Sequence, residues 1–112
     1  YVSQTNRLCI IHIVEMEYAQ PISLAYVAGK VNLSTQYLCK LFVDEVGENF
    51  NDYVSRVRME KAHDLVLYTD LKVYEIAEKV GIPNFRYFST LYKKWFGESP
   101  KESRALTHNN MN

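Results

Sequence analysis

Long apolar segments are absent from this chain of 112 residues, and no signal peptide opens it. A transmembrane helix needs about 20 consecutive apolar residues, so the sequence predicts a protein without a membrane partner. The first residue is tyrosine and not methionine, which indicates a segment of a longer protein.

Cysteine is scarce. Cys9 and Cys39 are too far apart in sequence for a C-x-x-C metal or redox motif. Such sparing use of cysteine is typical of a reduced, cytoplasmic protein, although a disulfide between these two residues stays open on sequence alone.

Catalytic patterns are missing as well. The chain has no glycine-rich phosphate loop and no nucleophile beside a base, so we expect no enzyme and no cofactor. His12 and Glu15 are three positions apart, but no further metal ligand accompanies them, which favours a surface pair over a metal site. His63 and His108 have no evident partner.

Charge of one sign is not in excess, since 13 basic residues balance 13 acidic ones. The balance is uneven along the chain, because residues 84–104 carry five basic and two acidic side chains, a net +3, which leaves −3 elsewhere. A basic end on a neutral chain favours a localised anionic partner.

Strand-like alternation is also absent, and the four glycines and three prolines stand between helical patterns. Ser23 and Ser34 are good N-caps and Gly47 is a good C-terminal stop. Residues 107–112 are expected to form a frayed tail. The expected helices cover residues 6–19, 23–31, 34–47, 51–68, 73–80 and 84–96.

The last of these helices has two unlike faces. At about 100° per residue its aromatic and aliphatic side chains gather on one side and its basic and hydroxyl side chains on the other. Phe85 and Tyr87 lie near the boundary. The residues expected to be mostly buried here and in the helix over 34–47 are Leu38, Leu41, Phe42, Phe88, Leu91, Tyr92 and Trp95.

These two helices form part of an internal repeat. An offset of fifty aligns them, and an offset of forty-nine aligns the short helices before them, so the second copy has one extra residue near Pro83. A short helix with a small residue, a tight turn and an amphipathic helix are typical of a helix-turn-helix unit. The aligned pairs are Ser34 with Asn84, Leu38 with Phe88, Leu41 with Leu91, Phe42 with Tyr92, Gly47 with Gly97, Val27 with Ile76, Ala28 with Ala77, Val31 with Val80, and Asn32 with Gly81.

The segments "ISLAYVAGKVNLSTQYLCKLFVDEVGENFNDYVSRVRMEKAHDLV" and "VYEIAEKVGIPNFRYFSTLYKKWFGESPKESR" resemble the DNA-binding domain of AraC/XylS-type transcription regulators. The resemblance covers roughly residues 8–104, and the second segment matches the family spacing more specifically. The stretch "RMEKAHDLVLYTDLKVYEIAEKVG" is most similar to members fused behind a receiver domain, the output domains of two-component response regulators.

The resemblance implies an all-α, homeodomain-like fold in which two helix-turn-helix subdomains are joined by a long central helix. It implies sequence-specific binding of double-stranded DNA, with two recognition helices in successive major grooves. An upstream receiver or sensor domain and RNA polymerase are the further candidate partners. The expected organisation is a linker over 1–7, a first unit over 8–48, a bridging helix over 49–69, a second unit over 70–104 and a tail over 105–112.

Base-reading residues follow from the same alignment with the family. Glutamine can pair with adenine, and arginine or lysine with guanine. Ser34 and Lys94 are candidates for phosphate contacts. The candidates are Thr35, Gln36, Cys39 and Lys40 in the first unit and Asn84, Phe85, Arg86, Ser89, Thr90 and Lys93 in the second.

Several positions depart from the family pattern. Thr90 stands where many members carry arginine, Cys39 where a polar residue is usual, and Ser103 in place of an aromatic residue before Arg104. We therefore expect the second unit to contribute mainly phosphate contacts. A redox-sensing role for Cys39 is disfavoured, because only Lys40 beside it would lower the pKa of its thiol.

Two alternatives stay open. Lys93 and Lys94 could be an ordinary solvated face, and Arg56 and Arg58 could form ion pairs with Asp52 or Glu60 or meet phosphate. The competing function is an all-helical protein-interaction module with degenerate helix-turn-helix units.

Overall fold

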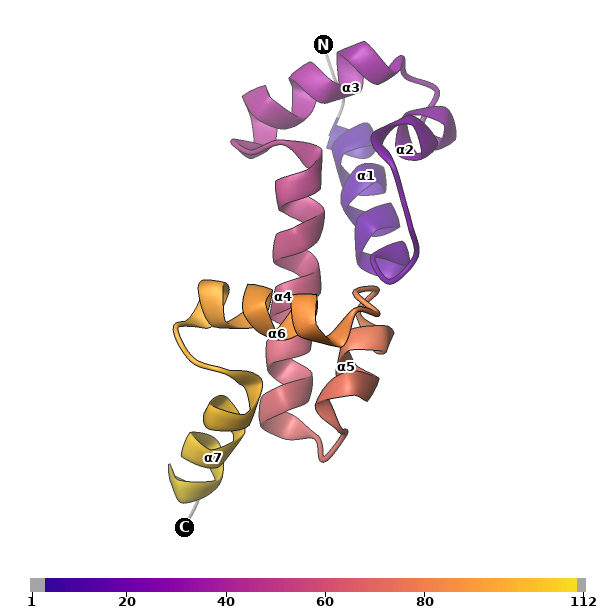
Figure 1. Ribbon diagram of the computed structural model, residues 1–112. Coiled ribbons are helices and arrows are strands. Elements are labelled where there is room, and N and C mark those ends of the chain that lie inside the picture. Colours follow the sequence, from indigo (N-terminus) through magenta and orange to yellow (C-terminus); the bar gives the residue numbers. More distant parts are fainter. Residues whose placement is uncertain (1–3, 111–112) are drawn as a thin grey trace. The chain divides into compact units, whose positions relative to one another are not determined.

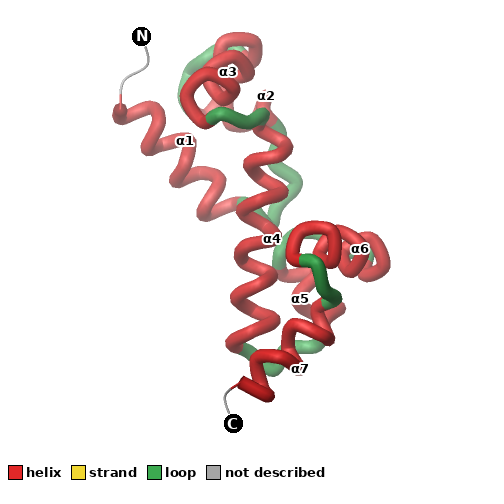
Figure 2. The backbone as a smooth tube through the Cα atoms, turned by 90° about the vertical axis from the view of Figure 1, so that its left-hand side faces the viewer, coloured by secondary structure: helices red, strands yellow, loops and turns green. Residues whose placement is uncertain are grey.

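The computed structural model describes the backbone of residues 4–110 and the side chains of residues 7–107. In this part of the chain every regular element is helical and no strand occurs (Figure 1, Figure 2). The predicted all-α class is therefore confirmed. The elements are α1 (Gln4–Glu17), α2 (Leu24–Lys30), α3 (Thr35–Leu41), the π-helical η1 (Phe42–Val46), α4 (Phe50–Tyr68), α5 (Val73–Lys79), α6 (Phe85–Phe96) and α7 (Pro100–Asn110).

The chain divides into two compact units, residues 1–57 and residues 58–112. The division falls inside α4, so each unit holds one part of this helix. Each unit also contains a pair of packed helices, α2 with α3 in the first and α5 with the longer α6 in the second. These are the two predicted helix-turn-helix pairs.

The turn of the first pair needs a left-handed residue, and Asn32 supplies it with a φ of 58°. The amide of Leu33 then donates to the carbonyl of Ala28 at 3.0 Å, which satisfies the end of α2. Ala28 is buried, and its small side chain lets α2 and α3 approach closely.

The second turn repeats this geometry with one more residue. Gly81 has a φ of 85°, and the amide of Ile82 donates to the carbonyl of Ala77 at 2.9 Å. Pro83 is the extra residue before α6, as the shift from an offset of forty-nine to one of fifty predicts. The shared turn geometry shows that the repeat is a structural one.

The second helices of the two pairs, α3 and α6, begin alike and end differently. Ser34 and Asn84 cap them by accepting the amide hydrogens of Tyr37 and Tyr87 at 3.1 and 3.0 Å. Left-handed glycines, Gly47 and Gly97, follow both helices. The amide of Gly97 bonds to the carbonyl four residues back, whereas α3 passes into the π-turn η1, which the sequence pattern does not indicate.

The core of the first unit centres on Phe42. Its ring lies 5.3 Å from that of Phe50 in an edge-to-face arrangement and 5.6 Å from that of Tyr53. Leu38 is also fully buried, and Leu41 is half-buried at the edge of the same cluster. The predicted core positions of this unit thus hold, with Leu41 less covered than expected.

In the second unit Phe88 and Tyr92 are fully buried and Leu91 is half-buried. Trp95 is 40% exposed, so its expected burial is wrong. Helical phase gives the direction of a side chain but not the extent of the neighbours that cover it. Trp95 lies in the last turn of the twelve-residue α6, whereas its partner α5 has only seven residues.

The chain remains helical to Asn110, so the expected frayed tail is wrong for residues 107–110, while residues 111–112 lie outside the described residues. Ser99 caps α7, since its hydroxyl accepts the amide of Glu102 at 3.1 Å and the Glu102 carboxylate accepts the amide of Ser99 at 3.3 Å. At the other end α1 begins at Gln4, inside the expected linker. The predicted domain boundaries themselves stay a prediction.

Two polar side chains have partners that the sequence pattern does not indicate. Arg56 pairs with Glu48, its Nε donating at 2.9 Å, and its guanidinium lies over the ring of Tyr53. The ring of His63 stacks on Phe96 with centroids 4.3 Å apart, so the expectation that His63 has no partner is wrong. None of the described helices combines the length and apolar character needed to cross a bilayer.

Candidate nucleic-acid interface

The polar face of α3 is open to solvent. Thr35, Gln36, Cys39 and Lys40 are all exposed, at spacings that place them on one side of the helix. Leu38, between them in sequence, points into the core. The first unit therefore presents a hydroxyl, an amide, a thiol and an ammonium group together.

The equivalent face of α6 has the same layout with other side chains. Phe85, Arg86 and Thr90 are exposed and Ser89 is half-buried. These four residues lie fifty positions after Thr35, Gln36, Cys39 and Lys40, in the same order. Both units thus place a polar or aromatic side chain at each of the four equivalent positions.

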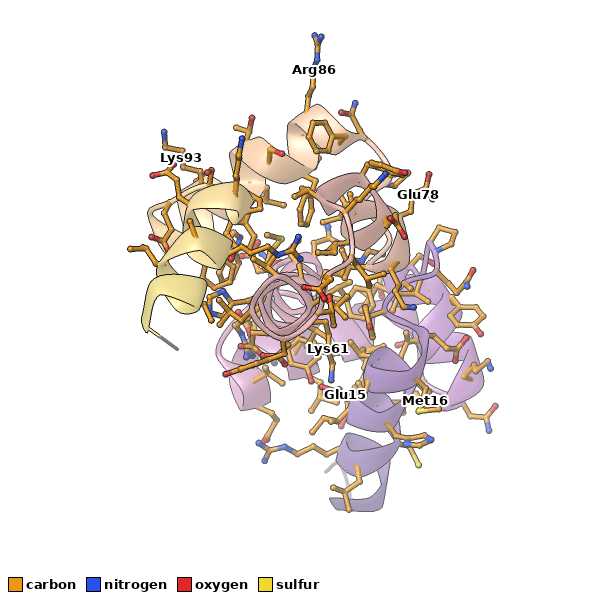
Figure 3. The ribbon with its side chains drawn as sticks, turned by 90° about the horizontal axis from the view of Figure 1, so that it is seen from below. Glu15, Met16, Lys61, Glu78, Arg86 and Lys93 are labelled. Carbon is orange, nitrogen blue, oxygen red and sulfur yellow. The ribbon has the colours of Figure 1, made fainter. Side chains whose placement is uncertain are left out.

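Arg86 and Lys93 mark the two ends of this face. Figure 3 shows both side chains pointing away from the body of the second unit, Arg86 from the first turn of α6 and Lys93 from its later part. Lys94 is exposed beside Lys93, and Asn84 is exposed at the cap. A planar arginine at a helix N-terminus can address a base edge or a phosphate, and the lysines can neutralise phosphates.

Thr90 has a different environment from its counterpart Lys40. Its hydroxyl donates to the carbonyl of Arg86 at 3.0 Å, one turn back in the same helix. This local bond occupies the only hydrogen of the Thr90 hydroxyl, which limits what it can donate to another molecule.

Two tyrosines belong to the same surfaces. Tyr37 is 41% exposed and Tyr87 is 58% exposed, and they occupy equivalent positions, fifty residues apart, in the first turns of α3 and α6. Tyr37 was not among the expected site residues, and the exposure of Tyr87 stayed open. The offset of fifty pairs them, but the sequence leaves the exposure of Tyr87 open, so the repeat alone does not identify Tyr37 as a surface residue.

The two thiols and Lys30, the lysine at the end of α2, have ordinary surroundings. Cys9 and Cys39 are both exposed and free. Lys30 lies 3.6 Å from the carboxylate of Glu17, and the hydroxyl of Tyr26 donates to the same carboxylate at 2.5 Å. A hydrogen bond with Tyr26, followed by the charge of Glu17, raises the pKa of Lys30, so this lysine stays protonated and has an internal counter-charge.

Comparison with known proteins places these features in a family. Residues 27–105 match the family described as a helix-turn-helix domain. The Msm operon regulatory protein of Streptococcus mutans is 31% identical over 110 residues, which is 98% of this chain and 38% of that protein. The chain spans between about a quarter and two fifths of the length of the curated relatives that it matches most strongly.

Solved structures agree with this match. The C-terminal domain of the two-component response regulator yesN from Fusobacterium nucleatum is 41% identical, with a TM-score of 0.82, over 91% of this chain and 99% of that domain. The DNA-binding domain of AdpA, solved with a target DNA, has a TM-score of 0.85 at 18% identity over 96% of both chains, a likeness of fold.

Proposed function

This chain belongs to the AraC-type helix-turn-helix family of DNA-binding domains, and from that premise we propose that it binds double-stranded DNA sequence-specifically to regulate transcription. The family is a class of transcription-regulator domains and not of enzymes. Two recognition helices, α3 and α6, enter successive major grooves. The exposed, equivalent polar faces of the two helices support this proposal most directly.

The roles within each face follow from side-chain chemistry. Gln36 and Lys40 in the first unit and Arg86 in the second are the base-reading residues, because their amide, ammonium and guanidinium groups match base edges. Lys93 and Lys94 contact phosphates. The second unit contributes mainly phosphate contacts, which is consistent with the internally bonded hydroxyl of Thr90.

The same residues can serve as a solvated surface in a protein-interaction module, which is the competing function. The exposed aromatic rings of Phe85 and Tyr87 suit either role. Basic side chains at Lys40, Arg86 and Lys93, with no acidic residue among the expected contacts, favour DNA.

We further propose that the chain is the output domain of a longer, cytoplasmic regulator. The similarity to C-terminal domains of response regulators supports an upstream receiver or sensor domain, and RNA polymerase is the candidate partner once DNA is bound.

Selection of bound duplexes from a random DNA pool tests the proposal. A conserved site should emerge, and the chain should bind it at least a hundredfold more tightly than a scrambled duplex at about 0.1 M salt, within the range of specificity ratios known for such proteins. Recovery of an unenriched pool, with equal weak affinity for all duplexes, would contradict the proposal and favour the interaction module.

A further inference from the structure

The two recognition helices can be compared position by position. Each runs from a side-chain cap to a left-handed glycine, Ser34 to Gly47 and Asn84 to Gly97, and each interval is thirteen positions long. An offset of fifty therefore aligns the far ends of the two helices as well as their beginnings.

At these far ends the charge is reversed. Lys93 and Lys94 in the second unit correspond to Val43 and Asp44 in the first, and Trp95 corresponds to Glu45. Residues 84–97 contain three basic and no acidic residues, a net +3, whereas residues 34–47 contain one basic and two acidic residues, a net −1. The difference of four charges lies within two equivalent segments of one small protein.

The side chains at the reversed positions face solvent in both units. Val43, Asp44 and Glu45 are exposed in η1, and Val43 keeps 52% of its surface accessible. Among the described side chains no ion pair involves Asp44 or Glu45, while the neighbouring Glu48 is paired with Arg56. The two carboxylates thus present uncompensated negative charge.

DNA reacts to such charges through its phosphates. Each phosphate neutralised by a lysine steepens the dependence of log K on log salt by about 0.9, and a carboxylate near the backbone opposes binding. Side chains at the lysine positions of α6 would meet phosphates, so Asp44, which is equivalent to Lys94, and the adjacent Glu45 would repel them, while Val43 offers them no charge.

We infer that Asp44 and Glu45, with Val43, keep the far end of the first recognition helix off the DNA backbone, so that this helix contacts DNA through its first part, Ser34 to Lys40. The second unit supplies most of the salt-dependent affinity through Lys93 and Lys94. This division of roles rests on the proposed function and concerns which residues limit affinity and set its salt dependence.

Exchanging the residues at positions 43 and 44 with those at the equivalent positions 93 and 94 tests the inference. Val43→Lys/Asp44→Lys copies the second unit into the first and adds three charges, and Lys93→Val/Lys94→Asp makes the opposite change. The first variant should bind the selected duplex and a scrambled one about tenfold more tightly at 0.1 M salt, with a slope steeper by about 1 to 2. The second should lose about tenfold or more on both duplexes, with a shallower slope.

Asp64→Lys is the control for charge alone, because Asp64 is an exposed residue of α4 outside both helix-turn-helix pairs. It should change the affinity less than twofold. Asp44→Asn/Glu45→Gln removes the repulsion without new lysines and should tighten binding about two- to threefold. Circular dichroism and melting temperatures of all variants check that they fold. If the lysine variant does not fold, the neutral variant alone tests the inference.

The outcomes are distinct. If the unmodified chain binds no duplex, the proposed function fails. If it binds its selected site but the lysine and neutral variants show unchanged affinity and slope, the inference fails and the proposed function stands. Equal tightening by Asp64→Lys also overturns the inference, because the effect would then be one of total charge.

Discussion

The hydroxyl of Tyr92 lies 3.0 Å from Nδ1 of His63, across from α6 to the second part of α4. The buried Ser103, on α7, donates its hydroxyl hydrogen to the carboxylate of Glu98 at 2.7 Å. An offset of fifty makes Phe42 and Tyr53 of the first unit equivalent to Tyr92 and Ser103, and these two rings lie with their centroids 5.6 Å apart. The second unit thus has a tyrosine hydroxyl with a polar partner, His63, where the first unit has the apolar ring of Phe42.

We predict that Tyr92→Phe destabilises the chain by about 1 to 2 kcal/mol at pH 7, because His63 loses its hydrogen-bond partner on the buried Tyr92. Urea titration measures the loss. Tyr74→Phe, at an exposed tyrosine of α5, is the matched control and should stay within about 0.5 kcal/mol. A loss no larger than that of the control would show that the hydrogen bond contributes nothing net.

Alkaline pH should distinguish the same two tyrosines. Burial raises the pKa of Tyr92 above its ordinary value of 10.0, because the charged phenolate is poorly solvated there. The unfolded chain therefore releases this proton first, and the contribution of Tyr92 to stability is complete below pH 10 and falls as the pH rises through the folded pKa. Stability measured between pH 9 and 11 should fall less steeply in Tyr92→Phe than in Tyr74→Phe. Parallel curves would contradict this assignment.

The burial of the two large aromatic side chains predicts unequal costs of truncation. Phe42→Ala should destabilise by about 3 to 5 kcal/mol, because Phe42 is fully enclosed by Leu38, Phe50 and Tyr53. Trp95→Ala should cost less than about 2 kcal/mol, since 40% of its surface is already exposed. Denaturant unfolding compares the two, and equal losses would mean that Trp95 is covered in solution.

The left-handed turn residues offer a test of backbone strain. Asn32→Ala should destabilise by about 1 kcal/mol, because an alanine at a φ of 58° lacks the tolerance of asparagine for this conformation. Asn32→Gly should lie within about 0.5 kcal/mol of the unmodified chain. Thermal unfolding of both variants is the measurement, and equal stability of the alanine and glycine variants would contradict a left-handed residue 32 in solution.

Much of this architecture can be predicted from the sequence because it depends on local chemistry. Ser34, Asn84 and Gly97 act within one turn of their own positions, and the repeat brings the two pairs into register. The structure at the C-terminal ends of α3 and α6 depends instead on contacts with neighbouring helices, which are distant in sequence. The exposure of Trp95 does not follow from the helical period, because the period does not tell how far the neighbouring helix extends. The π-turn η1 does not follow from it either, because the period assumes a regular α-helix.

The polar partners are harder still to predict. His63 and Tyr92 are twenty-nine positions apart and meet only because α6 packs on α4. The expected contact residues are exposed, with Ser89 half-buried, because amphipathic phase determines which side of a helix faces out. Tyr37 is not among the expected contact residues, and its place on the outer face follows from the structure, where 41% of its surface is exposed.

The last prediction concerns how each recognition helix reads DNA. Gln36→Ala and Lys40→Ala should relax the preference at particular base pairs, costing about 1 to 3 kcal/mol on the selected site for a good bidentate contact and little on scrambled DNA. Lys93→Ala should instead weaken binding to both duplexes and flatten the salt slope by about one. Arg86 lies in the first turn of α6, where side chains enter the groove, so Arg86→Ala should behave as the base-reading variants do.

Thr90→Val is the matched control on the same face, because it keeps the shape of the side chain while removing a hydroxyl that already bonds to the carbonyl of Arg86. It should change the affinity less than Arg86→Ala on every duplex. Titrations of selected and scrambled duplexes at several salt concentrations separate the two kinds of contact, since base reading changes the ratio of affinities and phosphate contact changes the slope. Unchanged cognate affinity in both Gln36→Ala/Lys40→Ala and Arg86→Ala/Lys93→Ala would exclude these faces as the DNA-reading surfaces, and α3 and α6 would then present ordinary solvated polar residues.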